Sequence, residues 1–75
     1  MTRLPSVSGR ACVRALERAG FRKKHQKGSH IVMRRDIPFA QTVVPDHKEL
    51  KPGTLRQIIS QAGLSVARFV ELLRN

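Results

Sequence analysis

Residues 21–35, FRKKHQKGSHIVMRR, have the pattern of a β-hairpin. Two extended segments, residues 21–26 and 30–35, flank the short sequence Lys27-Gly28-Ser29. Gly28 can adopt the positive φ that a tight hairpin turn requires. The stretch therefore predicts two antiparallel strands, which need further elements to cover one of their faces.

The second of these strands has two chemically different faces, because successive side chains of a strand point to opposite sides. Ile31 and Met33 share one face. The other face carries His30, Val32 and Arg34. We expect the apolar pair to face the helices, which leaves His30 at the start of the strand, on or near the open face, unless a bulge changes the alternation.

A short helix is expected before the hairpin. Ser8 is a suitable N-cap for a helix over residues 9–19, and Gly20 can end it. The apolar face of this helix consists of Cys12, Ala15, Leu16 and Ala19. Another face carries Arg10, Arg14 and Arg18, which is either an ordinary solvated face or a surface that binds an anion.

Further elements are expected after the hairpin. A turn leads to a third strand over residues 39–44, and a polar loop follows at residues 46–51. Pro52 suits the first turn of a second helix, which Gly63 closes, and Ser65 can cap a last helix. The fold class is therefore α+β, in the order α-β-β-β-α-α, with a three-stranded antiparallel sheet and helices on one face.

The length and charge of the chain limit its function. Its 75 residues form one domain, residues 1–75, with a thin core. The chain contains 15 Lys and Arg but only 5 Asp and Glu, and Glu17 is the sole acidic residue among the first 35. A chain of this charge is expected to bind an anionic partner, either a polyphosphate or an acidic protein. Three Phe without Tyr or Trp argue against base stacking, so we expect recognition of RNA backbone and shape.

Several classes of site are not expected. Cys12 is the single cysteine, so it can form neither an internal disulfide nor a cysteine-based zinc site. The histidines and carboxylates lack the spacings of a metal site, and we predict neither a metal nor a cofactor. No apolar run reaches the length of a membrane span, so the sequence indicates no membrane and a reducing cytoplasm.

One cluster of residues suggests chemistry. Lys27-Gly28-Ser29-His30 lies among six basic residues and no acidic residue between positions 22 and 35. An imidazole beside a bound phosphodiester can remove the proton of a ribose 2′-hydroxyl or protonate the leaving 5′-oxygen. His30 is the candidate catalytic residue, although a lone histidine in a strand is often a bystander. The candidate RNA contacts are Lys23, Lys24, Lys27, Gly28, Ser29, Arg34 and Arg35. His25 is expected to be exposed and inert. His47, in the loop before the second helix, is either a solvated loop residue, which we favour, or a contact for phosphate.

The order and spacing of four sequence blocks resemble those of one known family. These blocks are ALERAGF at residues 15–21, KGSH at 27–30, TVVPDH at 42–47 and KPGTLRQIISQAGLS at 51–65. Together they are similar to the HicA (YcfA-like) toxins of HicA–HicB toxin–antitoxin pairs. The resemblance extends from about Pro5 to Leu73.

This resemblance implies a double-stranded-RNA-binding-like fold and a ribosome-independent mRNA interferase. The family's catalytic histidine falls on His30, with Gly28 and Ser29 as turn residues and Lys27 as a basic flank. The resemblance also implies a HicB-like antitoxin that covers the site, and thus a toxin–antitoxin hetero-oligomer. Ile31 stands where many relatives have a second histidine, so His30 is expected to act alone and slowly.

Three functions remain open from the sequence. The first is a metal-independent endoribonuclease toxin that acts on mRNA. The second is a non-catalytic RNA-binding module of the same fold. The third is a small basic protein that mainly docks to an acidic partner. Steep weakening of RNA binding with salt would distinguish the first two from the third.

Overall fold

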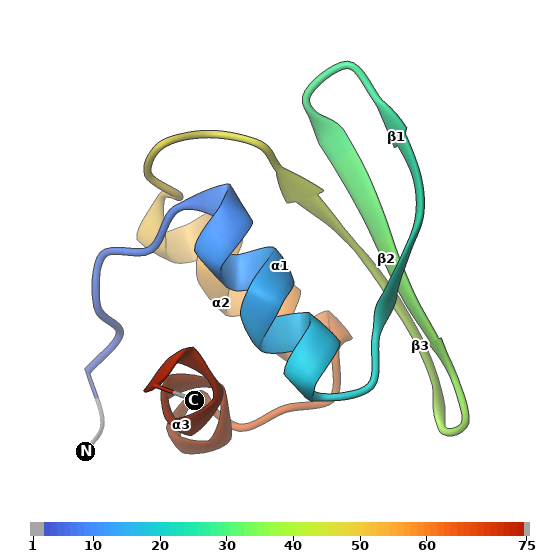
Figure 1. Ribbon diagram of the computed structural model, residues 1–75. Helices are drawn as coiled ribbons and strands as arrows, with labels where there is room; N and C mark the ends of the chain where they lie inside the picture. Colours follow the sequence, from blue (N-terminus) through green and yellow to red (C-terminus); the bar gives the residue numbers. More distant parts are fainter. Residues whose placement is uncertain (1–2, 75) are drawn as a thin grey trace.

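The chain folds into three helices and one three-stranded sheet. The computed structural model describes residues 3–74 (Figure 1). The elements are α1 (Gly9–Arg18), β1 (Arg22–Lys27), β2 (His30–Asp36), β3 (Phe39–Pro45), α2 (Pro52–Gln61) and α3 (Val66–Arg74). The α+β class and the order α-β-β-β-α-α are confirmed.

The sheet is an antiparallel meander in the order β1-β2-β3. Lys27 pairs with His30 across a two-residue turn, and Gly28 in that turn has a φ of 58°, as predicted for a tight hairpin. β3 pairs with β2 along the whole length of both strands. The register shifts in β1, between Lys23 and His25, and not in β2, so the predicted alternation of β2 is preserved.

Local signals fix the ends of the helices. The Ser8 hydroxyl accepts a hydrogen bond from the Ala11 N–H at 3.0 Å, which caps α1 as predicted. Pro52 occupies the first turn of α2. At α3, the Ser65 hydroxyl accepts the N–H of Arg68 at 3.0 Å. The two serine caps and the first-turn proline explain why the three helices begin where the sequence indicated.

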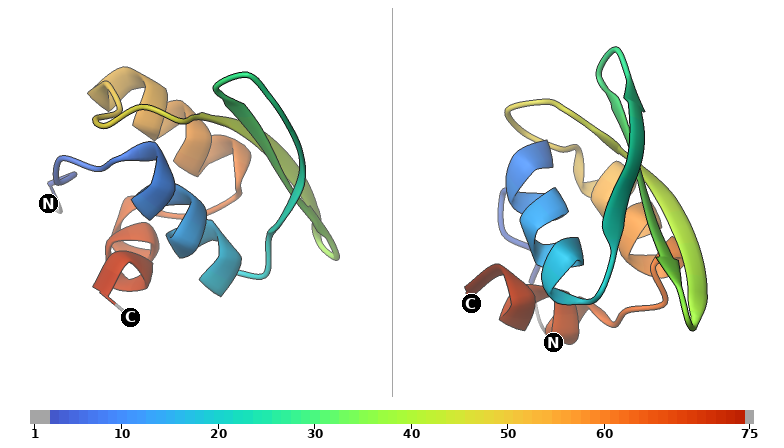
Figure 2. Two further views of the ribbon diagram at one scale, coloured as in Figure 1. Left: turned by 45° about the horizontal axis from the view of Figure 1, so that its top comes forward. Right: turned by 45° about the vertical axis from the view of Figure 1, so that its right-hand side comes forward.

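All three helices lie on the same side of the sheet, but not in one layer (Figure 2). α1 and α2 pack on the sheet, mainly against β3, whereas α3 packs mainly against α1. The expectation of helices on one face is therefore correct, with the refinement that α3 is farther from the strands. In the part of the chain that the structure describes, no helix lies on the opposite face of the sheet.

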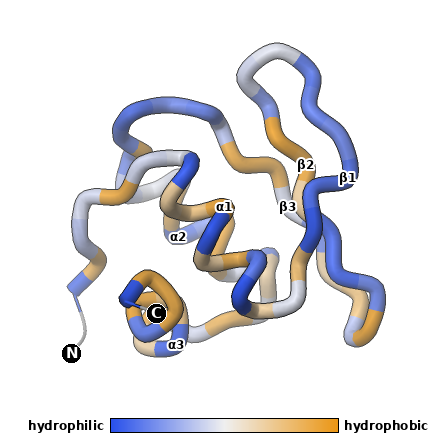
Figure 3. The backbone as a smooth tube through the Cα atoms, in the orientation of Figure 1, coloured by the Kyte–Doolittle hydropathy of each residue, from blue (hydrophilic) through white to orange (hydrophobic). Residues whose placement is uncertain are grey.

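The core lies between the sheet and the helices. Its largest fully buried side chains are Phe69, Leu16, Met33, Leu55, Leu72, Val44 and Cys12. Burial raises the pKa of the Cys12 thiol to about 12, so this cysteine packs as a small apolar residue. Figure 3 shows hydrophilic β1 beside the more hydrophobic β2 and β3.

The end of the β1–β2 hairpin extends past the helices (Figure 2). Every residue of β1 is exposed, which is consistent with its sequence RKKHQK at an edge of the sheet. Among residues 3–74, no helix has both the length and the apolarity needed to cross a membrane.

Candidate nucleic-acid interface

The two faces of the β1–β2 hairpin carry different side chains. On the face away from the helices, which we call the outer face, Lys27 lies opposite His30 and His25 lies opposite Val32. Lys23 pairs with buried Met33 and therefore points to the inner, helix-bearing face. The bulge in β1 makes this arrangement possible, because the extra residue Lys24 places Lys23 and His25 on opposite faces.

His30 lies at the projecting end of the hairpin, on the outer face. Its side chain is exposed, and its neighbours across the strands are Lys27 in β1 and Pro45 in β3. His30 is thus accessible on the outer face, as the alternation of side chains along the strand predicts. An exposed imidazole next to an ammonium group can approach a phosphodiester without rearrangement of the protein.

Backbone hydrogen bonds hold the turn before His30 in place. The Asp46 N–H donates to the Ser29 carbonyl at 2.6 Å, and the Gln26 side-chain amide donates to the Gly28 carbonyl at 3.0 Å. A Cβ atom added at Gly28 would meet nothing within 4 Å, so the outside of the turn is open to a ligand. The position of His30 is therefore rigidly linked to the loop that follows β3.

That loop is in turn fixed against the start of α1. The Gly9 N–H donates to the His47 carbonyl at 2.8 Å. A Cβ atom at Gly9 would overlap the Pro45 carbonyl oxygen and lie 3.1 Å from the Asp46 Cα. Only glycine permits this close approach, which explains a residue of low helix propensity in the first turn. No local pattern along the chain predicts this contact.

The inner face of the hairpin borders a groove. The groove lies between α1 and β1 and has a volume of about 290 Å³. Arg10 and Arg14 line it from α1, and Lys23 lines it from β1. Arg10 and Arg14, which the sequence left open as an ordinary solvated face, thus line the same groove as Lys23, a predicted RNA contact.

Sequence comparison now identifies the family. The sequence model of the HicA toxin of bacterial toxin–antitoxin systems matches residues 9–64, which is more than half of the 75-residue chain. The chain belongs to the HicA toxin family. A search of curated proteins by sequence gives no match. The matched HicA region begins at the first residue of α1 and includes the whole sheet and α2.

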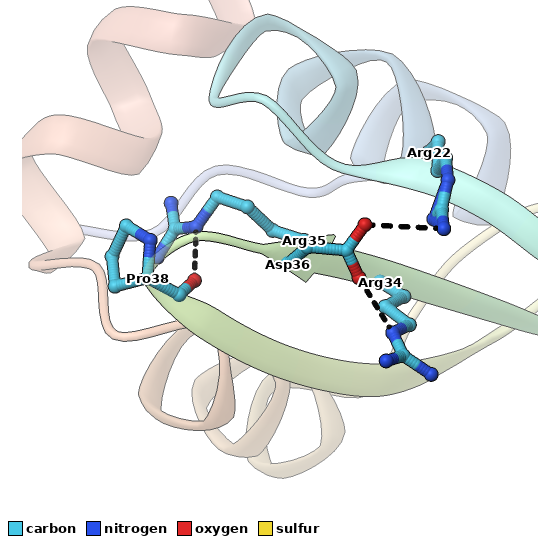
Figure 4. Close-up of polar contacts among 5 residues, drawn as sticks. All are labelled: Arg22, Arg34, Arg35, Asp36 and Pro38. Atoms are coloured by element: carbon cyan, nitrogen blue, oxygen red, sulfur yellow. Dashed lines mark hydrogen bonds and ion pairs between the residues drawn. The ribbon is translucent and has the colours of Figure 1, made fainter.

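Two arginines of this HicA chain lie at the far end of the hairpin from His30. Arg22 and Arg34 face each other on the outer face. Both contact the Asp36 carboxylate, Arg22 at 3.2 Å and Arg34 at 2.9 Å (Figure 4). The Arg34 guanidinium also lies 5.1 Å from the centre of the Phe39 ring. The structure therefore gives the predicted RNA contact Arg34 two partners within the protein.

Arg35 points to the inner face of the HicA sheet, where its guanidinium meets three carbonyl oxygens. It donates to Pro38 at 3.0 Å, to Ala19 at 3.2 Å and to Ala62 at 3.4 Å. Ala19 and Ala62 are the C-caps of α1 and α2, so one side chain serves the C-termini of two helices. The guanidinium also lies 4.7 Å from the Phe21 ring centre. Sequence reasoning missed this structural role.

The predicted site residues of the HicA chain are thus divided between places. Lys27, Gly28, Ser29 and His30 are together at the end of the hairpin. Lys24 is at the bulge and Lys23 lines the groove, whereas Arg34 and Arg35 lie beside β3 and the helix ends. Within residues 3–74, no three His, Cys, Asp or Glu side chains are close enough to hold a metal ion.

Proposed function

We propose that this HicA-family chain is the toxin of a type II toxin–antitoxin system and cleaves mRNA as a metal-independent endoribonuclease. The observation that carries the proposal is the position of His30. Its exposed imidazole lies beside Lys27, directly after a turn whose Ser29 carbonyl accepts a hydrogen bond from the Asp46 N–H. Membership of the HicA toxin family supports the same function.

The chemistry needs one proton-transfer group because RNA supplies its own nucleophile. The neutral His30 imidazole removes the proton of a ribose 2′-hydroxyl, and the oxygen attacks the adjacent phosphorus. The bond to the 5′-oxygen breaks, which leaves a 2′,3′-cyclic phosphate and a new 5′-hydroxyl end. The leaving oxygen receives its proton from the imidazolium or from water. The Lys27 ammonium stabilises the negative charge that develops on the phosphoryl oxygens.

RNA binding would use the basic residues around this turn. Lys23, Lys24 and Lys27 supply cations, and the open backbone at Gly28 and Ser29 lets a phosphate approach closely. The net charge of +10 adds a general attraction for polyphosphates. Arg34 would add a weaker contact on the outer face, because Asp36 already pairs with it.

A HicB-like antitoxin would inhibit the toxin by covering His30 in a hetero-oligomer. The outer face offers apolar area for such a partner, because Phe39 is 64% exposed and Val43 is 43% exposed on it. Val32, which pairs with Val43 and lies two residues from His30 on the same face, is 9% exposed. Since the substrate is mRNA, both proteins would act in the cytoplasm.

The decisive experiment compares two histidines on the same face. His30→Ala should reduce cleavage of a long RNA by about a hundredfold or more, since loss of a general base has an effect of that order. His25→Ala is the matched control and should keep its activity, because His25 is exposed on the same strand pair but lies away from the turn. EDTA should leave cleavage unchanged.

Binding separates the proposal from the alternative of a non-catalytic RNA-binding module. The His30→Ala protein should still bind RNA, with an affinity that falls steeply with salt. Cleavage that persists in His30→Ala would contradict the catalytic role of His30. No cleavage by the parent protein, together with normal RNA binding, would support the non-catalytic module.

A further inference from the structure

The groove between α1 and β1 carries a second inference about RNA, which rests on the proposed function. It lies on the inner face of the hairpin, whereas His30 lies on the outer face. Its volume of about 290 Å³ is close to the lower limit of small-ligand pockets, about 300 Å³. A groove of this size can receive one nucleotide but not a double helix.

Two cations in the groove are available to an anion. Arg14 and Lys23 line it from opposite walls, and neither has a carboxylate within 4.0 Å among residues 3–74. Arg10 is the third cation, and Asp46 pairs with it at 3.5 Å. A phosphodiester between Arg14 and Lys23 would meet two positive charges that the protein itself leaves unneutralised.

The base of the groove is apolar. Val13 is half-buried and Ile31 is 6% exposed, and both line the groove from between its charged walls. None of the described residues that line the groove is aromatic. A ribose or a base would therefore contact aliphatic side chains, which favours a single unstacked nucleotide over a stacked row of bases.

The groove also contains a carboxylate that can only accept hydrogen bonds when ionised. Glu17, the sole acidic residue of the first 35, lines the groove and has no ion pair within residues 3–74. Gln26 also lines it and donates one amide hydrogen to the Gly28 carbonyl; its oxygen and its second N–H can pair with either an amino group or a carbonyl, so Gln26 does not discriminate between bases. The Glu17 carboxylate can accept from an exocyclic amino group but cannot donate to the O4 carbonyl of uracil.

We propose that this groove binds one nucleotide of single-stranded RNA and selects a base that carries an exocyclic amino group. Arg14 and Lys23 hold its phosphate, Val13 and Ile31 contact its ribose or base, and Glu17 accepts from its amino group. Since His30 is on the opposite face, the strand crosses the edge of the hairpin between the two places. The nucleotide read in the groove is therefore not the one at the cleaved bond.

The test measures binding to the full chain with His30→Ala, so that cleavage does not interfere. The probes are hexamers of cytidine and of uridine, which differ at each base by an amino group in place of a carbonyl. The cytidine hexamer should bind about tenfold more tightly, as one added charge-assisted hydrogen bond predicts. Glu17→Gln should remove this preference, because a side-chain amide can also donate to uracil.

The phosphate contacts are tested with variants that each remove one positive charge, so that they have the same net charge. Arg14→Gln and Lys23→Gln should each weaken binding of both hexamers about fivefold, whereas Arg56→Gln, exposed on α2, should change it less than twofold. Cytidine monophosphate should shift the methyl NMR signals of Val13 and Ile31. The variants are expected to fold, because the four substituted side chains are exposed: Arg14, Glu17, Lys23 and Arg56.

Equal affinities for the two hexamers, or unchanged methyl signals, would overturn the inference. So would equal losses in Arg14→Gln and Arg56→Gln. These failures are distinct from failure of the proposed function, because they concern binding alone. A parent protein that does not cleave RNA but still prefers the cytidine hexamer would contradict the enzymatic proposal and leave the nucleotide groove intact.

Discussion

The two ends of the β1–β2 hairpin carry similar basic sequences but differ in what their cations contact. At the open end, next to the β2–β3 turn, Arg22 and Arg34 both pair with Asp36, and Arg34 also lies over Phe39. At the β1–β2 turn, Lys27 lies opposite His30 and has no carboxylate within 4.0 Å among residues 3–74. The cations of the open end are partly neutralised by a shared carboxylate, whereas the cation at the turn is available to a ligand.

This difference separates structural cations from functional ones. A guanidinium that already donates to carboxylates or carbonyls must lose those bonds before it binds a phosphate, and that loss opposes binding. A lysine in solvent loses only water. The number of basic residues in a segment is therefore a weaker guide to RNA contact than the partners that the fold gives to each of them.

Substitution of Arg35 has the largest expected effect, which is on the stability of the fold and not on RNA binding. Arg35→Met should lower the free energy of unfolding by about 2–3 kcal/mol, because it removes charge-assisted bonds to the C-caps of α1 and α2 and the contact with Phe21. Arg35→Lys keeps the charge but not the forked geometry, so it should lose most of the same stability. Chemical denaturation measures both.

RNA binding decides between the two roles of Arg35. Per folded molecule, Arg35→Lys should bind RNA as the parent does. If Arg35→Met instead kept full stability and lost RNA affinity, its predicted role as an RNA contact would hold and its capping role would be contradicted.

Arg35 also shows where sequence reasoning ends. Local patterns predicted the elements: Ser8 as a cap, Gly28 in the turn, and the alternation that places His30 outward. These features depend on neighbours in the chain. Two of the three carbonyls that surround Arg35 come from residues 16 and 27 positions away, and the contact of Gly9 with Pro45 also joins distant segments.

The candidate site divides in the same way. KGSH identified one turn because its residues are consecutive. The α1–β1 groove depends on a helix face, a bulge and one strand face that meet only after folding. The recurrence of Arg10 and Arg14 at helical spacing was visible in the sequence, but nothing in it showed that Lys23 would face them.

A comparison of Lys27 with Arg34 tests the hairpin ends directly. Lys27→Gln should reduce RNA cleavage about tenfold, because Lys27 is next to His30 and has no carboxylate within 4.0 Å in residues 3–74. The slope of log affinity against log salt should also fall by about 0.7, the value of one contact with single-stranded RNA. Arg34→Gln should reduce cleavage only about twofold, since Asp36 already neutralises that side chain. The reverse order of effects would contradict the distinction between the two ends.

The smallest expected effect comes from removing the carboxylate that pairs with Arg22 and Arg34 at the open end of the hairpin. Asp36→Asn removes the carboxylate that contacts Arg22 and Arg34 and should raise RNA affinity about threefold, while the loss of stability stays below about 1 kcal/mol, as for other exposed ion pairs. Glu71→Gln is the matched control, because it makes the same change of charge and frees Arg68 on α3, away from the sheet. Filter binding at two salt concentrations measures both. Equal gains would mean that only net charge matters, and a larger gain in Asp36→Asn would mean that the outer face itself contacts RNA once its arginines are released.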